Sequence, residues 1–409
     1  MKRCLALLFL VPSVVAGQTL VMGPNFPASL IGEFNQGPVQ TDIDLTVPAP
    51  ADGSVTSVHF AWSQAGCPGV VKIKFFHRVG NSLTMSDERG PLGSVATDNV
   101  IAITPPVSVR QGDLIGITKL SPCGSPMRFG GAVGQVNMLR YAADVTGTVD
   151  VNAAASTTFN ILAVNGSGPA TRVLAAVLPV VGSTAGGFGS HFVTSLQLAN
   201  GHTGGPIVGR AVFHPAGAPA SDNDPAFSFS IDPQKSISYP DLVGAFGRTG
   251  LGSVDIYVQS GSAPTPTMVT RVFNDAGAAG TNGFAEDAIN AVPSSNPGER
   301  VLTANTTALL ITPVDPARTR YNIGVRSFFG GATFTATLRN PDGTVAASVT
   351  KSYLPMYFEQ VDSTSFFGGV PVSGNQTITI SVTAGSAVVY GATTDNVTND
   401  PSVQFAGTI

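Results

Sequence analysis

The sequence predicts an all-β protein. Runs of about four to eight residues rich in Val, Ile, Phe and Thr recur along the chain. Gly, Pro, Asn and Asp bound these runs, which is the pattern of β-strands and their turns. No window of about 12 residues carries the apolar stripe of a helix. The second half of the chain also repeats itself, so we expect several β-sandwich units.

The composition narrows the class of protein. Charged residues make up 11% of the 409 residues, against about a quarter in an ordinary soluble domain. The expected surface is therefore neutral and rich in Ser, Thr, Asn and Gly. With 21 Lys+Arg against 25 Asp+Glu, the chain has no basic field for phosphates, which excludes a nucleic-acid partner. Hydrophobic residues form 43% of the chain, which excludes a disordered protein.

Residues 1–17 have the pattern of a secretory signal peptide. Lys2 and Arg3 form a short positive region, and the apolar run Leu5–Val15 has the length of a signal-peptide core. Ala and Gly follow, where cleavage is expected. A membrane anchor is the alternative, but a proline interrupts the run and the run is too short to span a bilayer. We therefore expect a secreted, extracellular mature chain without a membrane span, with the periplasm or cell surface as alternatives.

Removing the leader leaves two cysteines, Cys67 and Cys123. An even count in an exported chain favours a disulfide. Both cysteines lie in turn-like contexts, AGCPG and SPCGS, which suits two loops joined at one end of a sheet. The alternative, a metal or redox pair, is disfavoured because the chain offers neither a CxxC spacing nor a nearby histidine.

The first expected unit covers residues 18–165. Asn165–Pro169 (NGSGP) is a break in composition, and we place the boundary of this unit there. Short helical turns stay open as an alternative at Pro240–Phe246 and Phe284–Asn290. The β-rich segments expected in the first unit are Val55–Trp62, Val70–His77, Val100–Ile103 and Val107–Ile117.

The remaining chain contains an internal repeat at offsets of about 120 residues, a length typical of one β-sandwich. It predicts two duplicated units, residues 170–290 and 298–409, connected by Ala276–Arg300. The matching segments are Phe213–Gly217 with Leu338–Gly343, Tyr239–Val243 with Phe358–Val361, Gly252–Gly261 with Asn375–Gly385, and Met268–Asp275 with Val388–Asp395.

This organisation resembles the tandem immunoglobulin-like or fibronectin-type modules of bacterial secreted and surface proteins. The first unit resembles an extracellular jelly-roll domain, because Val109–Ile117 (VRQGDLIGI) is similar to the strand-turn-strand segment of such domains. The resemblance implies a jelly-roll-like β-sandwich followed by two immunoglobulin-like β-sandwiches. Neither repeat contains the Cys…Trp…Cys pattern of antibody domains, so no functional residue is carried across.

Motifs for nucleophilic catalysis are not evident. A nucleophile elbow would read G-x-S-x-G, and Gly187–His191 (GFGSH) comes nearest to it. Ser190 and His191 are consecutive and would point to opposite faces of a strand. We therefore interpret this segment as a Gly-rich turn that enters a strand over His191–Ala199.

Glycoside hydrolysis needs two carboxylates on either side of the bond that is broken. A pair brought together only by folding stays open as an alternative, but many aspartates lie in turn contexts such as Asp52-Gly53. We expect no enzyme and assign no catalytic residue. The chain has five glutamates: Glu33, Glu88, Glu286, Glu299 and Glu359.

The histidines show no metal-binding spacing, and we assign no metal ligand. His59 and His77 fall within strand patterns and are interpreted as structural. Calcium, which prefers loop oxygens, is the one cofactor considered, and solvated turns are the alternative interpretation. The two calcium candidates are Asp222-Asn223-Asp224 with Asp232, and Asp395-Asn396 with Asn399-Asp400.

The only tryptophan is predicted to lie in the core. Strand alternation puts Trp62 on the same face as Val58 and Phe60, although an exposed ring would favour sugar binding. Four Asn-x-Ser/Thr sequons would mark the surface if the source organism glycosylates them, and are chance occurrences in a bacterial protein. They begin at Asn165, Asn305, Asn375 and Asn396.

These observations favour a secreted, non-enzymatic β-protein with a structural, adhesive or matrix role. The alternative is a carbohydrate- or cell-envelope-binding protein whose first unit contacts glycan, and a glycan-active enzyme ranks below it. The expected partners are extracellular or cell-surface components, with polysaccharide binding and self-association through strand edges as the two routes.

Overall fold

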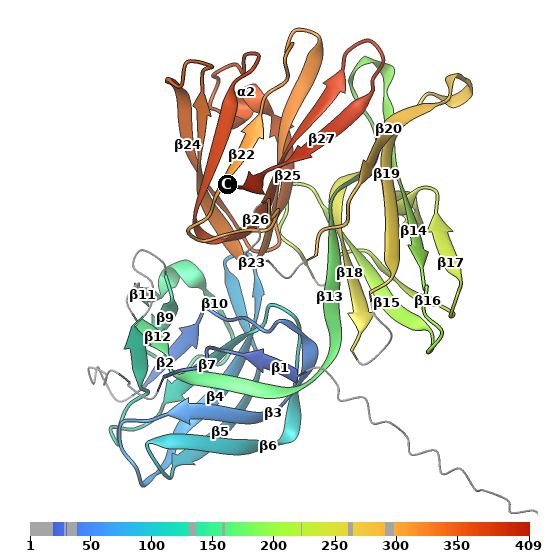
Figure 1. Cartoon of the computed structure of the whole chain (residues 1–409). Helices are drawn as coiled ribbons and strands as arrows, with labels where there is room; N and C mark the ends of the chain where they lie inside the picture. Colours follow the sequence, from blue (N-terminus) through green and yellow to red (C-terminus); the bar gives the residue numbers. More distant parts are fainter. Residues whose placement is uncertain are drawn as a thin grey trace, which may run out of the picture.

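The computed structural model describes residues 19–27, 30, 39–130, 136–157, 160–221, 223–260, 265–290 and 298–409. The predicted signal peptide lies outside the described residues. The chain is nearly all β and contains several antiparallel sheets, which confirms the all-β prediction (Figure 1). Three regions are named here by their sheets: an N-terminal unit (residues 19–170), a middle unit (171–290) and a C-terminal unit (298–409). No helix among these residues is long and apolar enough to cross a membrane.

The N-terminal unit consists of two facing sheets with a core between them. Apolar residues of both sheets, including Phe60, Phe75 and Ile115, are fully or almost fully buried together. One sheet contains β1 (Thr19–Met22), the first part of β13 (Val164–Ala185), β3 (Ala51–Ala61) and β6 (Asp98–Val109). The other has the order β10 (Thr148–Asp150), β5 (Ser82–Ser94), β4 (Cys67–Val79), β7 (Leu114–Lys119), β2 (Gln40–Asp44), β9 (Met138–Tyr141) and β11 (Ala155–Thr157), and β8 (Arg128–Gly130) pairs separately with β12 (Asn160–Leu162).

Two predictions for this unit are confirmed. Trp62 is completely buried, and its indole Nε1–H donates to the carbonyl oxygen of Cys123 at 3.0 Å. Cys67 and Cys123 form a disulfide with an S–S distance of 2.06 Å. The two cysteines are 56 positions apart, and closing a loop of that length stabilises the fold by about 4 kcal/mol in the chain-entropy account.

The middle unit is also built of two layers around an apolar core. Strand β13 joins the layers, because its last residues pair with β14 on the opposite layer. Its short helix α1 (Leu242–Ala245) is capped by Asp241, whose carboxylate accepts from Gly244 N. The first layer has the order β16 (Ala226–Ile231), β15 (Ile207–Pro215), β18 (Gly250–Gln259) and β13, and the second has β17 (Ser236–Tyr239), β14 (His191–Ala199), β19 (Thr267–Asp275) and β20 (Thr281–Glu286).

The C-terminal unit uses two long strands that each belong to both layers. Strand β23 (Thr319–Arg339) pairs with β26 (Thr377–Asp395) along its length, and the register shifts between Ser327 and Ala332. Its short helix α2 (Ser363–Phe366) is capped by Asp362. The other strands are β21 (Leu302–Thr303), β22 (Thr307–Ile311), β24 (Val345–Tyr353), β25 (Phe358–Asp362), β27 (Pro401–Phe405) and β28 (Gly407–Thr408).

The four repeated segments occupy corresponding places in the middle and C-terminal units. The middle unit pairs β15 with β18 and β14 with β19, while the C-terminal unit makes both pairings between β23 and β26. Gly331 and Gly385 lie where these long strands bend, with φ of +69° and +68°. A Cβ added at Gly385 would lie 2.0 Å from the carbonyl oxygen of Gly331, so the bend requires glycine there.

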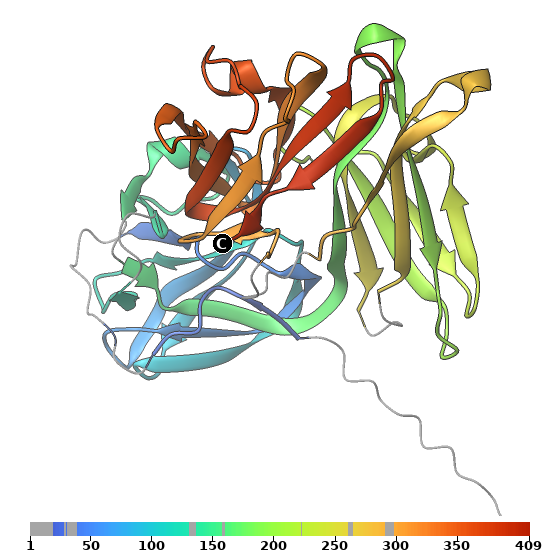
Figure 2. The ribbon, with the colours of Figure 1, turned by 45° about the horizontal axis from the view of Figure 1, so that its top comes forward.

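One strand crosses the expected boundary between the first two units, and one local expectation needs correction. Asn165–Pro169 is part of the unbroken strand β13, which passes from the N-terminal unit into the middle unit (Figure 2). A Cβ at Gly168 would lie 1.9 Å from the carbonyl oxygen of Ser54, so glycine here serves close strand packing. The second helical turn, considered at Phe284–Asn290, is wrong: this segment begins in β20 and contains no helix. The turn at Pro240–Phe246 is confirmed as α1. Short 3-10 turns of three residues each cover Val151–Ala153, Gly187–Gly189 and Gly277–Ala279.

Candidate functional site at the junction of the three units

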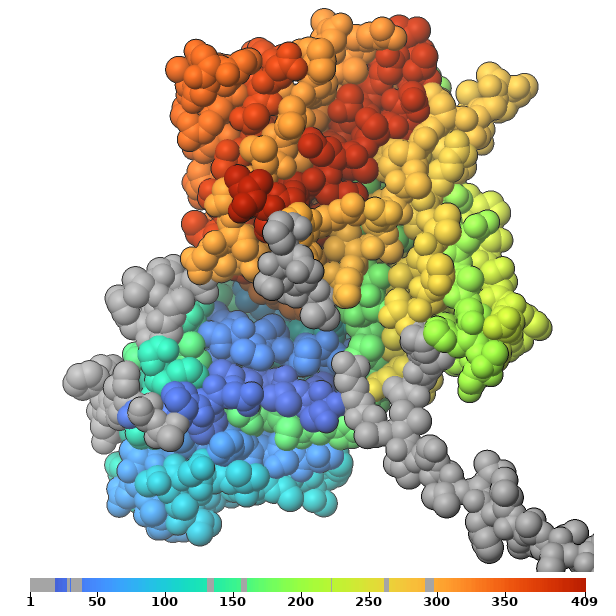
Figure 3. Space-filling view, viewed as in Figure 1, coloured from blue at the N-terminus to red at the C-terminus, as the bar shows by residue number. Residues whose placement is uncertain are grey.

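A pocket of about 560 Å³ lies where the three units meet. The C-terminal unit rests on the N-terminal unit, and the middle unit packs beside both (Figure 3). Loops and strand ends of the N-terminal unit, strands β13, β15 and β18, and the segment before β25 all contribute to its lining. We name this cavity the junction pocket.

The junction pocket is rich in arginine. The described residues that line it include four arginines against two aspartates, in a chain whose net charge is -4. The arginines come from the end of β4, the turn after β6, and strands β13 and β15. These charged residues are Arg78, Arg110, Arg172, Arg210, Asp52 and Asp224.

These arginines differ in how far they are paired. Arg172 lies 3.6 Å from a carboxylate oxygen of Asp52 through its Nε. Arg78 donates through Nε to the carbonyl oxygen of Gly80 at 3.1 Å. Arg210 is half-buried on β15 and has no hydrogen bond or ion pair to any residue that the structure describes. The pocket therefore contains one guanidinium group, that of Arg210, whose N–H donors have no partner among the described residues.

Behind the pocket lies a buried ion network that joins the middle and C-terminal units. Arg326 of β23 and Asp255 of β18 are both completely buried, and Nη2 of Arg326 lies 2.9 and 3.0 Å from the two carboxylate oxygens. Arg326 also donates through Nε to Ser253 Oγ at 2.8 Å. His214 contacts Asp255 through Nε2 at 3.1 Å and Asp224 through Nδ1 at 2.6 Å. We name these residues the junction network.

The junction network holds its groups in their charged forms. Burial opposes ionisation of Asp255, but the charges of Arg326 and His214 outweigh it and keep the pKa of Asp255 below its usual value. Burial likewise opposes a charged His214, yet Asp255 and Asp224 raise the pKa of the imidazole. Both ring nitrogens face carboxylates, which can only accept, so His214 is not a free base. The network suits a fixed joint rather than proton transfer.

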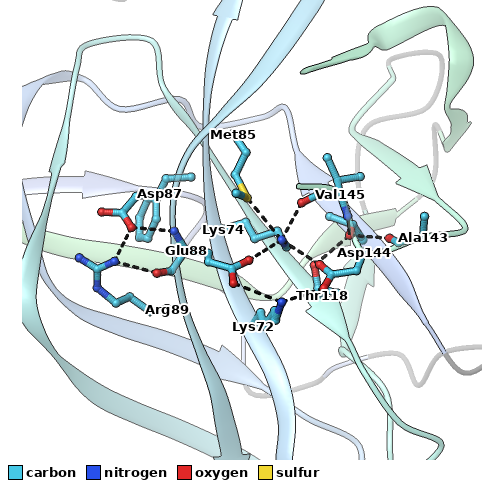
Figure 4. A network of polar contacts seen from close by, with 12 residues as sticks. Lys72, Lys74, Met85, Asp87, Glu88, Arg89, Thr118, Ala143, Asp144 and Val145 are labelled. Carbon is cyan, nitrogen blue, oxygen red and sulfur yellow. Dashed lines mark hydrogen bonds and ion pairs between the residues drawn. The ribbon is translucent and has the colours of Figure 1, made fainter. Parts of the chain in front are cut away.

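A second charged cluster lies on β4, β5 and the segment after β9 (Figure 4). Lys74 is completely buried and its Nζ lies 2.7 Å from Glu88 and 2.8 Å from Asp144. Lys72 contacts the same two carboxylates at 3.2 and 2.7 Å. We name these four residues the lysine quartet.

The lysine quartet is balanced, with two cations and two anions. Burial would raise the pKa of Glu88 and Asp144, but hydrogen bonds and charges from the two lysines outweigh it and lower both values. A glycosidase acid needs a raised pKa to carry its proton at working pH. The quartet therefore has the chemistry of a structural ion cluster, although it brings a Glu and an Asp together.

The remaining glutamates are dispersed. Glu286 is buried, and burial raises its pKa to about 8. It accepts from Val180 N at 3.0 Å. Glu299 accepts from two backbone N–H groups, and Glu359 accepts from the Tyr353 hydroxyl at 2.7 Å. Glu33 lies outside the described residues.

The Gly187–His191 segment is a turn, as expected. Ser190 is buried and its hydroxyl donates to the carbonyl oxygen of Gly187 at 2.8 Å, while His191 is exposed at the first position of β14. The strand over His191–Ala199 is confirmed. The other strand histidines are paired with aspartates: His59 Nε2 lies 2.5 Å from Asp98, and His77 Nδ1 lies 2.8 Å from Asp113.

The calcium candidate around Asp395 does not form an open oxygen cage among the described residues. Asp395 accepts from the backbone N–H groups of Val397 and Thr398 and pairs with Arg318 at 3.0 Å. Arg320 donates to the side-chain oxygens of Asn396 and Asn399. Guanidinium groups thus occupy the positions that a cation would take.

In the other calcium candidate, the described carboxylates have separate partners. Asp224 contacts His214 in the junction network, and Asp232 pairs on the surface with Lys235 at 3.3 Å. Asp222 lies outside the described residues. No group of three or more metal-ligating side chains occurs within the described part of the chain.

The four sequons fall in different surroundings. Asn165 is buried in β13 and donates to the carbonyl oxygen of Pro24 at 3.1 Å, so it does not mark the surface. Asn305 and Asn375 have positive φ, of 68° and 58°. Asn396 bonds Arg320 in the turn described above.

A second feature lies at the far end of the middle and C-terminal units, where the β13–β14 and β26–β27 turns meet (Figures 1 and 2). Phe188 is 69% exposed and has a φ of 57°, a strained value for an aromatic residue. Arg320 lies over its ring at 5.0 Å, and Asn399 donates to its carbonyl oxygen at 3.0 Å. Val397 in the neighbouring turn is 81% exposed. We name these four residues the distal tip.

Sequence reasoning missed both the junction pocket and the distal tip. The pocket arginines are far apart in the chain, and no local motif distinguishes them from other arginines. Phe188 lies in the Gly-rich segment Gly187–His191, which we interpreted as a turn. An aromatic residue inside a Gly-rich turn was the available signal for an exposed ring.

Comparison with known proteins does not place the chain in a family: no protein-family model matches it, and no curated protein matches its sequence.

Proposed function

We propose that this chain is a secreted, non-enzymatic extracellular β-protein with a structural, adhesive or matrix role. The observation that carries the proposal is the fixed joint between its units. Strand β13 continues from one unit into the next, and the junction network ties Asp255 of the middle unit to Arg326 of the C-terminal unit. A rigid arrangement of sandwich-like units can hold a surface at a fixed distance from its support.

Apolar packing supports the same joint. Leu174 and Val177 of β13 pack with Phe328 and Val388 of the C-terminal unit. The loop after β15 also pairs with the start of β25, where Gly217 N donates to the carbonyl oxygen of Phe358 at 2.8 Å. These contacts favour one rigid body over units that move on flexible linkers.

The adhesive part of the proposal draws on the distal tip. Strained backbone and exposed apolar groups together are a reason to suspect a contact surface. Phe188 and Val397 offer such groups at the end of two adjacent turns.

Export and the classes of the units are part of the proposal as well. The leader pattern and the Cys67–Cys123 disulfide support an oxidising extracellular compartment. The two facing sheets in each unit support a jelly-roll-like first unit, residues 18–165, and immunoglobulin-like second and third units, residues 170–290 and 298–409.

The test is a pull-down of the mature chain, from residue 18 onward, with whole cell envelopes and insoluble polysaccharides. The same samples are assayed for released reducing sugar, and the concentrated protein is viewed by electron microscopy. Phe188→Ser is compared with Val314→Ser, a matched control at a residue that is 78% exposed on another loop.

We expect saturable binding without sugar release, weakened by Phe188→Ser and unchanged by Val314→Ser. Sugar release would make the protein an enzyme and overturn the proposal. The absence of both envelope binding and ordered assemblies would also contradict the proposal. The alternative function, a carbohydrate- or envelope-binding protein, is favoured specifically by the junction pocket.

A further inference from the structure

The junction pocket contains an arginine, Arg210, that none of its lining carboxylates neutralises. Asp52 serves two groups, Arg172 at 3.6 Å and the backbone N–H of Gln111 at 3.0 Å. Asp224 is engaged by His214 at 2.6 Å. Among the described lining residues these are the only carboxylates, so none is left to pair with Arg210.

The position of Arg210 makes this imbalance significant. It lies on β15 directly across from Tyr257 of β18, and it is half-buried instead of extended into solvent. Removing a guanidinium from water without a partner is unfavourable. A bound anion would supply the missing partner, and guanidinium groups match the planar, two-oxygen geometry of a carboxylate.

The remaining walls of the pocket suit a small polar ring. Phe329, Tyr257 and Met356 line it with aromatic and apolar surface, and Ser54, Ser108 and Ser221 with polar groups. Burial raises the pKa of Tyr257 well above its usual value, so its hydroxyl stays protonated. A volume of about 560 Å³ is within the range of small-ligand pockets, about 300–1,000 Å³.

We infer that the junction pocket binds a carboxylate-bearing sugar, such as a uronic acid residue of an acidic polysaccharide, with Arg210 and Arg172 holding the carboxylate. The aromatic wall packs on the C–H face of the sugar ring, and the serines bond its hydroxyls. The choice of a sugar over another carboxylate rests on the proposed extracellular role. The requirement for an anion rests on the pocket alone.

The test is isothermal titration calorimetry on the oxidised mature chain at low ionic strength. The probes are galacturonate and its trimer, galactose as the neutral match, and citrate as a carboxylate that is not a sugar. Arg210→Gln is compared with Arg248→Gln, an exposed arginine outside the pocket. Thermal unfolding verifies that each variant is folded, and Arg172→Gln replaces Arg210→Gln should the latter not fold.

We expect galacturonate or its trimer to bind at least about tenfold more tightly than galactose, and Arg210→Gln to remove most of that difference. Arg248→Gln should bind like the natural chain, and binding should weaken as salt is added. Equal binding of galactose, or binding that Arg210→Gln does not change, would overturn the inference. Binding of citrate but not of galacturonate would overturn the assignment to a sugar.

Failure here is distinguishable from failure of the proposed function. Phe188 lies at the distal tip and does not line the junction pocket. Phe188→Ser should lose envelope binding and keep galacturonate binding. Arg210→Gln should lose galacturonate binding and keep envelope binding. Either result separates the two sites.

Discussion

The lysine quartet and the junction pocket treat similar charges in opposite ways. In the quartet, Lys72 and Lys74 share Glu88 and Asp144, and every charge has a partner within 3.2 Å. In the pocket, the two lining aspartates are engaged by Arg172 and His214, and Arg210 has no partner among the described residues. We infer from this comparison that charge balance distinguishes the two sites. The balanced quartet stabilises the fold, and the unpaired Arg210 of the pocket is suited to binding an anionic ligand.

The junction network belongs with the quartet in this comparison. Arg326 and His214 are cationic and face Asp255 and Asp224 at hydrogen-bond distance. The network lies next to the pocket, because two of its members, His214 and Asp224, also line the pocket. Balanced and unbalanced charges therefore occur side by side, so variants of each can be compared in one protein.

The largest expected effect is from Asp255→Asn. Removing one partner of a buried ion pair leaves an unpaired charge, which should lower the free energy of unfolding by about 3–5 kcal/mol. Urea denaturation measures the loss. The matched control is Asp232→Asn, because Asp232 is 64% exposed and pairs only on the surface, and it should stay within about 0.5 kcal/mol. Equal losses in the two variants would contradict the distinction between the buried ion pair of Asp255 and the surface ion pair of Asp232.

Lys74→Met should have an intermediate effect. Glu88 and Asp144 are partly exposed and retain Lys72, so we expect a loss of about 1–3 kcal/mol. The depressed pKa of Glu88 should rise toward its ordinary value in this variant, which NMR titration can follow. In the natural chain, stability from the two depressed carboxylate pKa values is present above about pH 4.5 and is lost on acidification. An unchanged pKa of Glu88 would show that Lys74 does not stabilise the charged form of the Glu88 carboxylate.

Glu286→Gln tests a buried acid that has no cation. With a pKa of about 8 in the folded state, Glu286 retains its proton after the unfolded chain has lost it above about pH 4.5. The folded state then binds more protons, so stability falls as pH rises from about 4.5 to 8.

Glutamine removes this dependence. The free energy of unfolding of the variant, relative to that of the natural chain, should increase by more than about 1 kcal/mol as the pH rises from 5 to 8. The reason is that one pKa unit corresponds to about 1.4 kcal/mol. Urea denaturation across pH measures the gain, with Asp232→Asn as the control because the Asp232 carboxylate is 64% exposed. A gain that does not grow with pH would contradict the assignment.

The sequence was sufficient for features that depend on local pattern. Strand alternation placed Trp62 in the core, and two cysteines in turn contexts predicted the disulfide. At Asn165–Pro169 the break in composition lies where β13 passes from one unit to the next, and Gly168 there allows close strand packing. Features that depend on distant segments could not be predicted. The arginines of the junction pocket come from β4, the turn after β6, β13 and β15, and only the packing of the units brings them together.

The most direct test of the central claim applies one chemical change to a paired and an unpaired arginine. The free energy of unfolding is measured for Arg326→Gln and Arg210→Gln under the same conditions without ligand. The charge-balance account predicts a loss of about 3–5 kcal/mol for Arg326→Gln and a change within about 0.5 kcal/mol for Arg210→Gln. Similar losses in the two variants would show that Arg210 is a structural residue like Arg326, and would contradict the account.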